Sequence, residues 1–335
     1  MAFNGKIDFV VPWVDGENKS WREKYEKYYA QIVDEDFNGE ERFRSDFELL
    51  LLWIRGVKKY ANWVNTIFIV VDRFTMNSLP KDLGQGVDLV CHDQFIPSQF
   101  LPTFNSNVIE IFSERIPELS EHFVLFNDDC YVVKPLGKED FFSDRGVPID
   151  SDFVSPLNSC IEYSHILLNN MILINKHFNY DYFKKMYLKK VLKNFDVRTL
   201  KSLFTTLTTG SFLGWNDEHM PIAYRKCDFK NTFKLCHKDR QSQGERRFRS
   251  RRDISHLLVR YWRLSNGEYE RRRSNSLGVF LEIEENVYQP NLRNALESNS
   301  KIVCINDTNM ANETSQKMYE GIKKILTTYY MRNIE

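Results

Sequence analysis

What the chain lacks narrows the range of its functions. Among its 335 residues, Lys plus Arg and Asp plus Glu number 46 each, so the formal net charge is zero. A general nucleic-acid-binding protein has a strong basic excess, and we expect no nucleic-acid partner. The six cysteines include no CxxC pair, and several lie in apolar segments. They indicate reduced, packed thiols of a cytoplasmic protein rather than a disulfide framework.

Targeting and membrane-spanning segments are also lacking. No apolar run approaches the roughly 20 residues that a membrane-spanning helix requires, and the sequence opens on a strand-like segment instead of a signal peptide. There is no internal repeat and no low-complexity segment. We therefore expect a cytoplasmic protein, with peripheral docking on the inner face of the cell membrane left open.

The hydrophobic content of 42% is sufficient for a large core. Apolar runs predict buried strands at Ile7–Val14, Thr66–Val71 and Val87–Cys91. Helical spacing predicts a helix over Ser20–Val33, opened by a capping box of Ser20 and Glu23, and another from Arg42 onward. The order of strands and helices predicts a Rossmann-like, mostly parallel α/β sheet.

Polar residues that follow these strands are candidates for binding a nucleotide. Ligands of open α/β sheets bind outside the carboxyl ends of the strands, which is where the WVDG turn lies. An ordinary strand-to-turn signal is the alternative for this turn. Just before the start of the next helix, Arg42 and Arg44 can help to hold a phosphate, or be solvated charge. The amide of Asn105 can contact a sugar or cap the following helix.

An acidic elbow is the central feature of the sequence. Phe123–Val133 (FVLFNDDCYVV) reads as a buried strand that ends at Asn127, Asp128 and Asp129. Adjacent carboxylates after an apolar strand favour a divalent metal, and a metal beside an α/β sheet often accompanies a phosphate ligand. A plain surface turn is the alternative.

The second half reads as more helical. A strand-like segment and a short strand enclose helical and polar stretches, and the C-terminus closes with a helix. The expected segments are a strand at Asn170–Ile174, a helix at Asp181–Phe195, a polar segment at Thr205–Gly214, a helix opened by Ser250 and Asp253, a strand at Lys301–Ile305 and a closing helix that contains Met318 and Ile325. We expect one catalytic unit over residues 1–335, with an α/β core in 1–150 and a helical part in 151–335 that completes the active site.

Taken together, these segments resemble the Stealth family of sugar-1-phosphate transferases, which includes bacterial capsular phosphotransferases and the catalytic subunit of the animal enzyme that modifies lysosomal mannose chains. Four blocks match in order, and the second is the most specific. The first block is IDFVVPWVDG (Ile7–Gly16), and the second runs from RFRSDFELLLLWI to RIPELSEHFVLFNDDCYVVKPL (Arg42–Leu136). The third combines HMP (His219–Pro221) with RFRSRRDISHLLVRYW (Arg247–Trp262), and the fourth is CINDTN (Cys304–Asn309). Pro12 stands where the family commonly has threonine, and the long insertions of the animal enzyme are absent.

The resemblance implies a nucleotide-sugar-binding, GT-A-like fold and transfer of a sugar-1-phosphate from a UDP-sugar to a glycan hydroxyl, with release of UMP. It implies a lipid-carrier-linked acceptor in capsule or exopolysaccharide synthesis. Donor binding is expected at Trp13, Asp15, Gly16, Arg44, Asp46 and Asn105. Mg²⁺ or Mn²⁺ is expected on Asp129, Asn306 and Asp307.

Three residues are implied in catalysis. Arg249 would steady the phosphoryl oxygens, and either His219 or Asp128 would deprotonate the acceptor hydroxyl. A packed turn histidine is the alternative for His219. A metal-dependent glycosyltransferase that releases UDP and a non-catalytic polysaccharide-binding protein are the alternative functions. The donor sugar, the linkage and the oligomeric state are left open.

Overall fold

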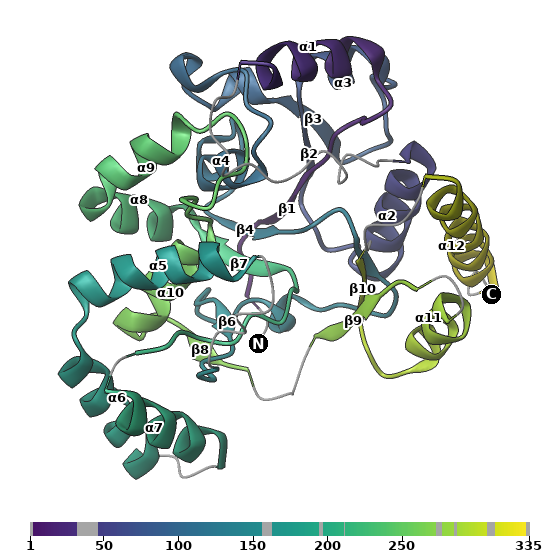
Figure 1. Cartoon of the computed structure of the whole chain (residues 1–335). Helices are drawn as coiled ribbons and strands as arrows, with labels where there is room; N and C mark the ends of the chain where they lie inside the picture. Colours follow the sequence, from purple (N-terminus) through teal and green to yellow (C-terminus); the bar gives the residue numbers. More distant parts are fainter. Residues whose placement is uncertain are drawn as a thin grey trace.

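The computed structural model describes residues 3–31, 46–155, 163–193, 197–210, 212–272, 277–284, 287–306 and 312–332. Its centre is a five-stranded sheet of order β3-β2-β1-β4-β7 (Figure 1). The strands are β1 (Ile7–Pro12), β2 (Ile67–Val71), β3 (Val87–Cys91), β4 (His122–Leu125) and β7 (Ile222–Arg225). The first four are parallel, and β7 is antiparallel to β4. The predicted mostly parallel α/β sheet is thereby confirmed.

Both faces of this sheet are covered, which explains why its strands read as continuous apolar runs. Alternate residues of β1 enter different cores: Phe9 and Val11 pack on one side, and Val10 packs on the other. The first face is covered by α2 (Phe47–Tyr60), α11 (Tyr288–Glu297) and α12 (Asn312–Arg332). The second is covered by α4 (Ser106–Ile111), α5 (Ser164–His177), α8 (Lys226–Leu235) and α10 (Leu257–Asn266).

The remaining helices lie at the margins. They are α1 (Lys19–Tyr29), α3 (Arg73–Ser78), α6 (Tyr180–Lys193), α7 (Val197–Thr209) and α9 (His237–Gly244). Each of the two large cores takes residues from both halves of the sequence. The division near residue 150 into a core and a completing part stays a prediction.

The acidic elbow joins two sheets. The segment Phe123–Val133 is not one strand, because the chain leaves the central sheet after β4, turns at Asn127–Asp129 and enters β5 (Cys130–Val132). In a three-stranded sheet, β5 is antiparallel to β10 (Ile302–Asn306), which is parallel to β9 (Gly278–Glu282). The predicted buried strand that ends at the elbow is thus confirmed as β4, and the residues after the elbow form a second strand, β5. A further two-stranded sheet joins β6 (Ile149–Asp150) to β8 (Glu270–Arg271).

Several predicted boundaries need correction. The side chain of Asn18, not Ser20, caps α1 by accepting a hydrogen bond from the Trp21 amide. The apolar run Asn170–Ile174 lies inside α5 and not in a strand, since a short apolar run does not distinguish the two by its period. The polar segment Thr205–Gly214 begins within α7. The helix assigned to Ser250 and Asp253 begins only at Leu257.

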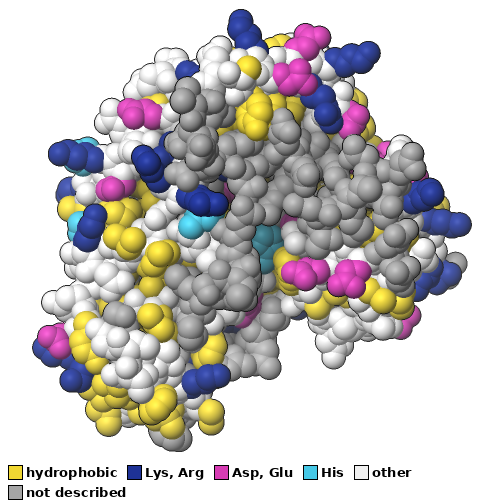
Figure 2. Space-filling model, in the orientation of Figure 1, with side chains coloured by type: hydrophobic (Ala, Val, Ile, Leu, Met, Phe, Trp, Pro, Cys, Tyr) yellow, Lys and Arg dark blue, Asp and Glu magenta, His cyan; other side chains and the backbone are white. Residues whose placement is uncertain are grey.

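Other predictions are confirmed: the strand at Lys301–Ile305 is β10, and the closing helix is α12. Within the ranges given above, no helix combines the length and the apolar character needed to cross a bilayer. On the face shown in Figure 2, Lys and Arg side chains are dispersed among acidic and apolar ones.

Candidate active site

The site lies where the parallel strands end. The turn after β1 is held by backbone contacts: Trp13 N–H donates to Val70 O at 2.8 Å, and Asp15 N–H donates to Thr75 Oγ1 at 3.3 Å. The Asp15 carboxylate accepts a hydrogen bond from the Glu17 amide, and this bond stabilises the turn. Because β4 ends at this same edge of the sheet, the acidic turn Asn127–Asp129 faces the same region as the turn after β1.

Asp128 lies in the middle of the acidic turn. Its side chain is exposed to solvent although it is densely surrounded by protein atoms. The dense surroundings and the neighbouring charge of Asp129 raise the pKa of Asp128 to about 7, and the positive charge of Arg249 partly opposes that rise. A carboxyl group with this pKa is suited to proton transfer near neutral pH.

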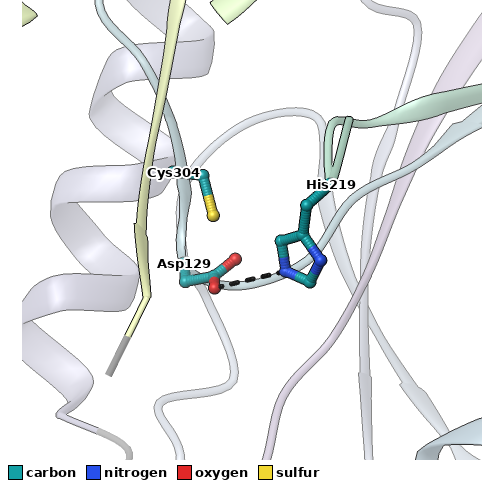
Figure 3. A group of neighbouring side chains, drawn as sticks. All are labelled: Asp129, His219 and Cys304. Carbon is teal, nitrogen blue, oxygen red and sulfur yellow. Dashed lines mark ion pairs between the residues drawn. The ribbon is translucent and has the colours of Figure 1, made fainter. Parts of the chain in front are cut away.

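His219 approaches the acidic turn from the segment before β7 (Figure 3). Its Nε2 lies 3.7 Å from Asp129 Oδ2 and 3.1 Å from Asn127 Nδ2. Burial lowers the pKa of His219, but contacts with Asp129 and the Cys304 thiol outweigh that effect and raise it to about 11. The imidazole is thus part of a charged cluster rather than an isolated turn histidine.

The backbone of His219 is strained. Its φ of 51° lies in the left-handed region, where a bulky side chain is uncommon. The Asp217 carboxylate accepts the His219 amide at 3.1 Å and helps to hold this conformation. Strain of this kind is retained where the surroundings impose it, frequently at functional sites.

Aromatic packing holds the segment that carries Arg249 beside the start of α4. The neighbouring Phe248 stacks on Phe104, with ring centroids 5.1 Å apart, and the Phe104 amide donates to Arg247 O at 2.7 Å. Arg249 Nη2 then donates to Ser106 Oγ at 2.7 Å, at the start of α4. Asp128, Asp129, His219 and Arg249 are therefore assembled from segments far apart in the sequence.

Comparison with known proteins shows the family to which the chain belongs. Residues 42–150 match the family model described as Stealth protein CR2, conserved region 2. The chain is 36% identical to a capsular polysaccharide phosphotransferase (WcwK) of Streptococcus pneumoniae, with 90% of this chain and 89% of that protein covered. It is 33% identical to the receptor polysaccharide phosphotransferase WefC of Streptococcus gordonii, with 95% of each covered. The chain belongs to the Stealth family.

An exopolysaccharide phosphotransferase (cps2G) of Lactiplantibacillus plantarum is a further relative, 34% identical over 91% of this chain and 88% of that protein. These relatives confirm the family resemblance, and this Stealth protein is a phosphotransferase. Among solved structures, the galactosyltransferase LgtC with donor and acceptor sugar analogues aligns over 98% of this chain and 96% of its own, at 7% identity and a TM-score of 0.40. Structural similarity at that level supports no conclusion about this chain.

Two residues beside the site in this Stealth protein were missed by sequence reasoning. Glu110 of α4 is partly buried, and burial raises its pKa to about 7 against the opposing charges of Arg249 and His219. His256 Nε2 lies 3.6 Å from Glu110 Oε2, and burial lowers the pKa of His256 to about 4. A single carboxylate on the apolar face of VIEIF was the available signal for Glu110.

The predicted donor-binding residues lie in different places in the structure. Trp13 and Gly16 lie in the turn at the sheet edge, and Trp13 is 5% exposed and packs near Phe47. Asp46 caps α2 and pairs with Lys323 at 2.8 Å. Arg44 and Asp307 lie outside the described residues. Donor contacts of Trp13, Asp15, Gly16, Arg44 and Asp46 stay predictions.

Asn105 takes the alternative role that the sequence left open. It is completely buried, its side-chain oxygen accepts the Asn107 amide at 3.0 Å, and it caps α4. Its Nδ2 donates to Phe248 O and to Asp253 Oδ2, both at 2.9 Å. Asn105 thus ties α4 to the segment that carries Arg249, and its side chain is closed to solvent.

The expected Mg²⁺ or Mn²⁺ can be compared with the donor atoms present. Asp129 supplies a carboxylate oxygen, and Ile305 N–H donates to Asp129 O at 2.9 Å, which brings the end of β10, and so Asn306, beside the acidic turn. Such oxygen donors fit both ions. His219 and Cys304 add nitrogen and sulfur donors, and sulfur fits neither Mg²⁺ nor Mn²⁺ well. Among the described residues, the fit thus rests on Asp129 and Asn306.

Proposed function

We propose that this Stealth protein transfers a sugar-1-phosphate from a UDP-hexose or UDP-N-acetylhexosamine to a hydroxyl of a glycan acceptor and releases UMP. The acceptor is a growing glycan on a lipid carrier, and the product is a phosphodiester linkage in a capsule or exopolysaccharide. The observation that supports this proposal is the convergence of Asp128, Asp129, His219 and Arg249 at the carboxyl edge of the sheet.

The reaction forms one P–O bond and breaks another. The acceptor oxygen attacks the phosphorus atom next to the sugar, and the bond from that phosphorus to the bridging oxygen breaks, so that UMP leaves with the electron pair. Of the two candidate bases, Asp128 is the one suited to take the hydroxyl proton, because its pKa is about 7, whereas the raised pKa of His219 keeps the imidazole protonated and able to stabilise negative charge. Such chemistry depends on positioning and charge neutralisation more than on covalent catalysis.

Arg249 is suited to hold the non-bridging oxygens of the transferred group. Its guanidinium is fixed by Ser106, and its charge already acts on Asp128 and Glu110. A planar guanidinium can bind two phosphate oxygens at once. A divalent cation held by Asp129 and Asn306, with Asp307 as a further predicted ligand, would neutralise charge on the diphosphate.

The deciding experiment measures the nucleotide product. The purified protein is incubated with Mg²⁺ or Mn²⁺, a panel of UDP-sugars and lipid-linked oligosaccharide acceptors, and UMP is quantified against UDP. Acceptor-dependent UMP, with a new phosphodiester signal in ³¹P NMR, is the expected result. Release of UDP would instead make the protein a glycosyltransferase, and metal-dependent donor binding without turnover would favour a polysaccharide-binding role.

A further inference from the structure

A thiol group lies within the acidic site. Asp129, His219 and Cys304 each offer one ligand atom, and the carboxylate oxygen, ring nitrogen and sulfur all lie within 4.8 Å of one another (Figure 3). Around a tetrahedral zinc ion, ligand atoms are separated by about 3.3 to 3.8 Å. Side-chain movements of roughly 1 Å would therefore complete a three-ligand site with a fourth position open.

The three ligands come from separate elements that the fold holds in register. Cys304 of β10 pairs with Cys130 of β5 and is completely buried. The side chains of Asp129 and His219 are 25% and 39% exposed, so an ion can reach the group from solvent. A metal site with one buried thiol ligand and two accessible ligands is open to solvent on one side.

We infer that this triad binds Zn²⁺ or another thiophilic divalent ion, with Cys304 as the sulfur ligand, and that this ion inhibits the transferase by occupying Asp129 and His219. Sulfur, nitrogen and carboxylate donors together match zinc, and such sites bind Zn²⁺ more tightly than Mn²⁺. The binding is independent of the proposed function, and only the inhibition rests on it.

The binding test uses the full chain with zinc alone, without any sugar donor. Zinc K-edge X-ray absorption of the protein loaded with one equivalent should show one sulfur ligand at about 2.3 Å. With Co²⁺, we expect a near-ultraviolet sulfur-to-cobalt band that Cys304→Ser abolishes and Cys91→Ser retains. Cys91 is a matched control, because it is a buried strand thiol in β3.

The outcomes separate the two proposals. A zinc shell of oxygen and nitrogen only, or a cobalt band that survives Cys304→Ser, would overturn the site. If the site is correct, zinc should suppress UMP release by wild-type protein, and Cys304→Ser should need about 100-fold more zinc for the same suppression. Absence of any UMP release would refute the proposed function while the X-ray result still decides the site.

An independent observation concerns the α6–α7 pair, which projects from the body of the molecule (Figure 1). Along α7, large apolar side chains recur at helical spacing on one face and are exposed. Their exposed fractions are 77% for Val197, 43% for Leu200, 66% for Phe204 and 42% for Leu207. On α6, Leu192 is 85% exposed. Figure 2 shows apolar side chains gathered over this region.

The exposed stripe belongs to a helix that is firmly packed on its other side. Ser202, Leu203 and Thr206 of α7 are buried, and Ser202 Oγ accepts the Val154 amide at 3.1 Å. In α6, Tyr187 Oη donates to Asp152 O at 3.1 Å. The apolar stripe is therefore a fixed surface feature.

The charges beside the stripe indicate what covers it. Lys185, Lys189 and Lys201 are exposed on these two helices, and Asp181 is the one exposed acidic side chain among those that the structure describes there. An apolar stripe flanked by lysines matches the interface of an anionic lipid bilayer. We propose that the α6–α7 pair docks on such a bilayer, which would bring the site to a lipid-linked acceptor; only this last consequence rests on the proposed function.

Vesicle sedimentation tests the docking. The full chain should sediment with vesicles of equal parts phosphatidylglycerol and phosphatidylcholine, and less with phosphatidylcholine alone. The double variant Leu192→Glu, Phe204→Glu should reduce binding by about tenfold or more. Leu235→Glu, on α8 and 58% exposed, is the matched control and should bind normally.

Equal binding of wild type and double variant would overturn this docking surface, as would no binding by wild type. Light scattering adds a further decisive outcome. A dimer that the double variant dissociates, with no vesicle binding, would assign the stripe to a second copy of the chain instead.

Discussion

Replacing Asp150 by asparagine should destabilise the fold by a predictable amount. Asp150 of β6 is 7% exposed and accepts hydrogen bonds from Arg260 Nε at 3.0 Å and Arg263 Nη2 at 2.6 Å. The two arginines are 4% and 2% exposed. The Asp150→Asn side chain would keep the shape but leave these buried cations without their shared carboxylate.

The size of this destabilisation depends on the hydrogen-bond and ion-pair partners that the two arginines keep. Arg263 keeps Asp228 at 3.4 Å, while Arg260 keeps the backbone carbonyls of Asn216 and Ser151. Removing one partner of a buried ion pair costs about 3 to 5 kcal/mol, and the partial compensation favours about 3 kcal/mol. With an unfolding entropy of about 2.1 cal/mol/K per residue, the midpoint of thermal unfolding should fall by about 4 °C.

Reversible urea unfolding and calorimetry measure this effect. Asp144→Asn is the control, because Asp144 is an exposed carboxylate nearby in the sequence and its loss should change stability by less than about 0.5 kcal/mol. If Asp150→Asn unfolds within about 1 °C of wild type instead, the arginines do not depend on Asp150, and the electrostatic account of this network is wrong.

Other predictions concern the site and its supports. His219→Ala should lower turnover at saturating donor by about 10²- to 10⁴-fold with donor affinity nearly unchanged; weakened donor binding with normal turnover would contradict a role of His219 in the chemical step. Arg249→Lys should lower kcat about tenfold or more, because lysine cannot bind two oxygens in one plane; an unchanged kcat in the UMP assay would remove the arginine from the reaction. Asn105→Ala should cost about 2 kcal/mol in urea unfolding, since it removes a helix cap and one of the donors to the buried Asp253 carboxylate, and a neutral result would contradict the contacts described. Burial alone would raise the pKa of Asp150, but its arginine partners lower it; its contribution to stability should therefore be present above about pH 4 and be lost as the pH falls through the lower folded pKa, and acid unfolding of Asp150→Asn should lack that component.

The strands of the central sheet could be predicted because burial on both faces leaves a continuous apolar signal, as in Ile67–Val71. The same signal failed at Asn170–Ile174, where a buried helix face produced an equally short apolar run. The elbow was located correctly in the sequence. Its position between two sheets was not predictable, because it depends on the pairing of β5 with β10.

Site residues that lie in a family motif could be predicted from the sequence. Residues that enter the site only through tertiary contacts could not. Asp129 and His219 came from matched blocks and lie 3.7 Å apart in the fold. Cys304 read as a core thiol, since a single cysteine in an apolar strand has no local feature that distinguishes a ligand. Asn105 could be read either as a donor contact or as a helix cap, because both roles use the same residue types.

The pairing of Cys130 with Cys304 has a consequence for the newly made chain. These partners are separated by roughly 170 residues, so the ribosome must add almost the whole second half before β5 can find β10. At about 5 to 20 residues per second, that interval lasts roughly 9 to 35 s. During it, the acidic turn is attached to a nascent sheet that lacks its neighbour. A chain released early would contain the most specific family motif and yet be unable to form the site.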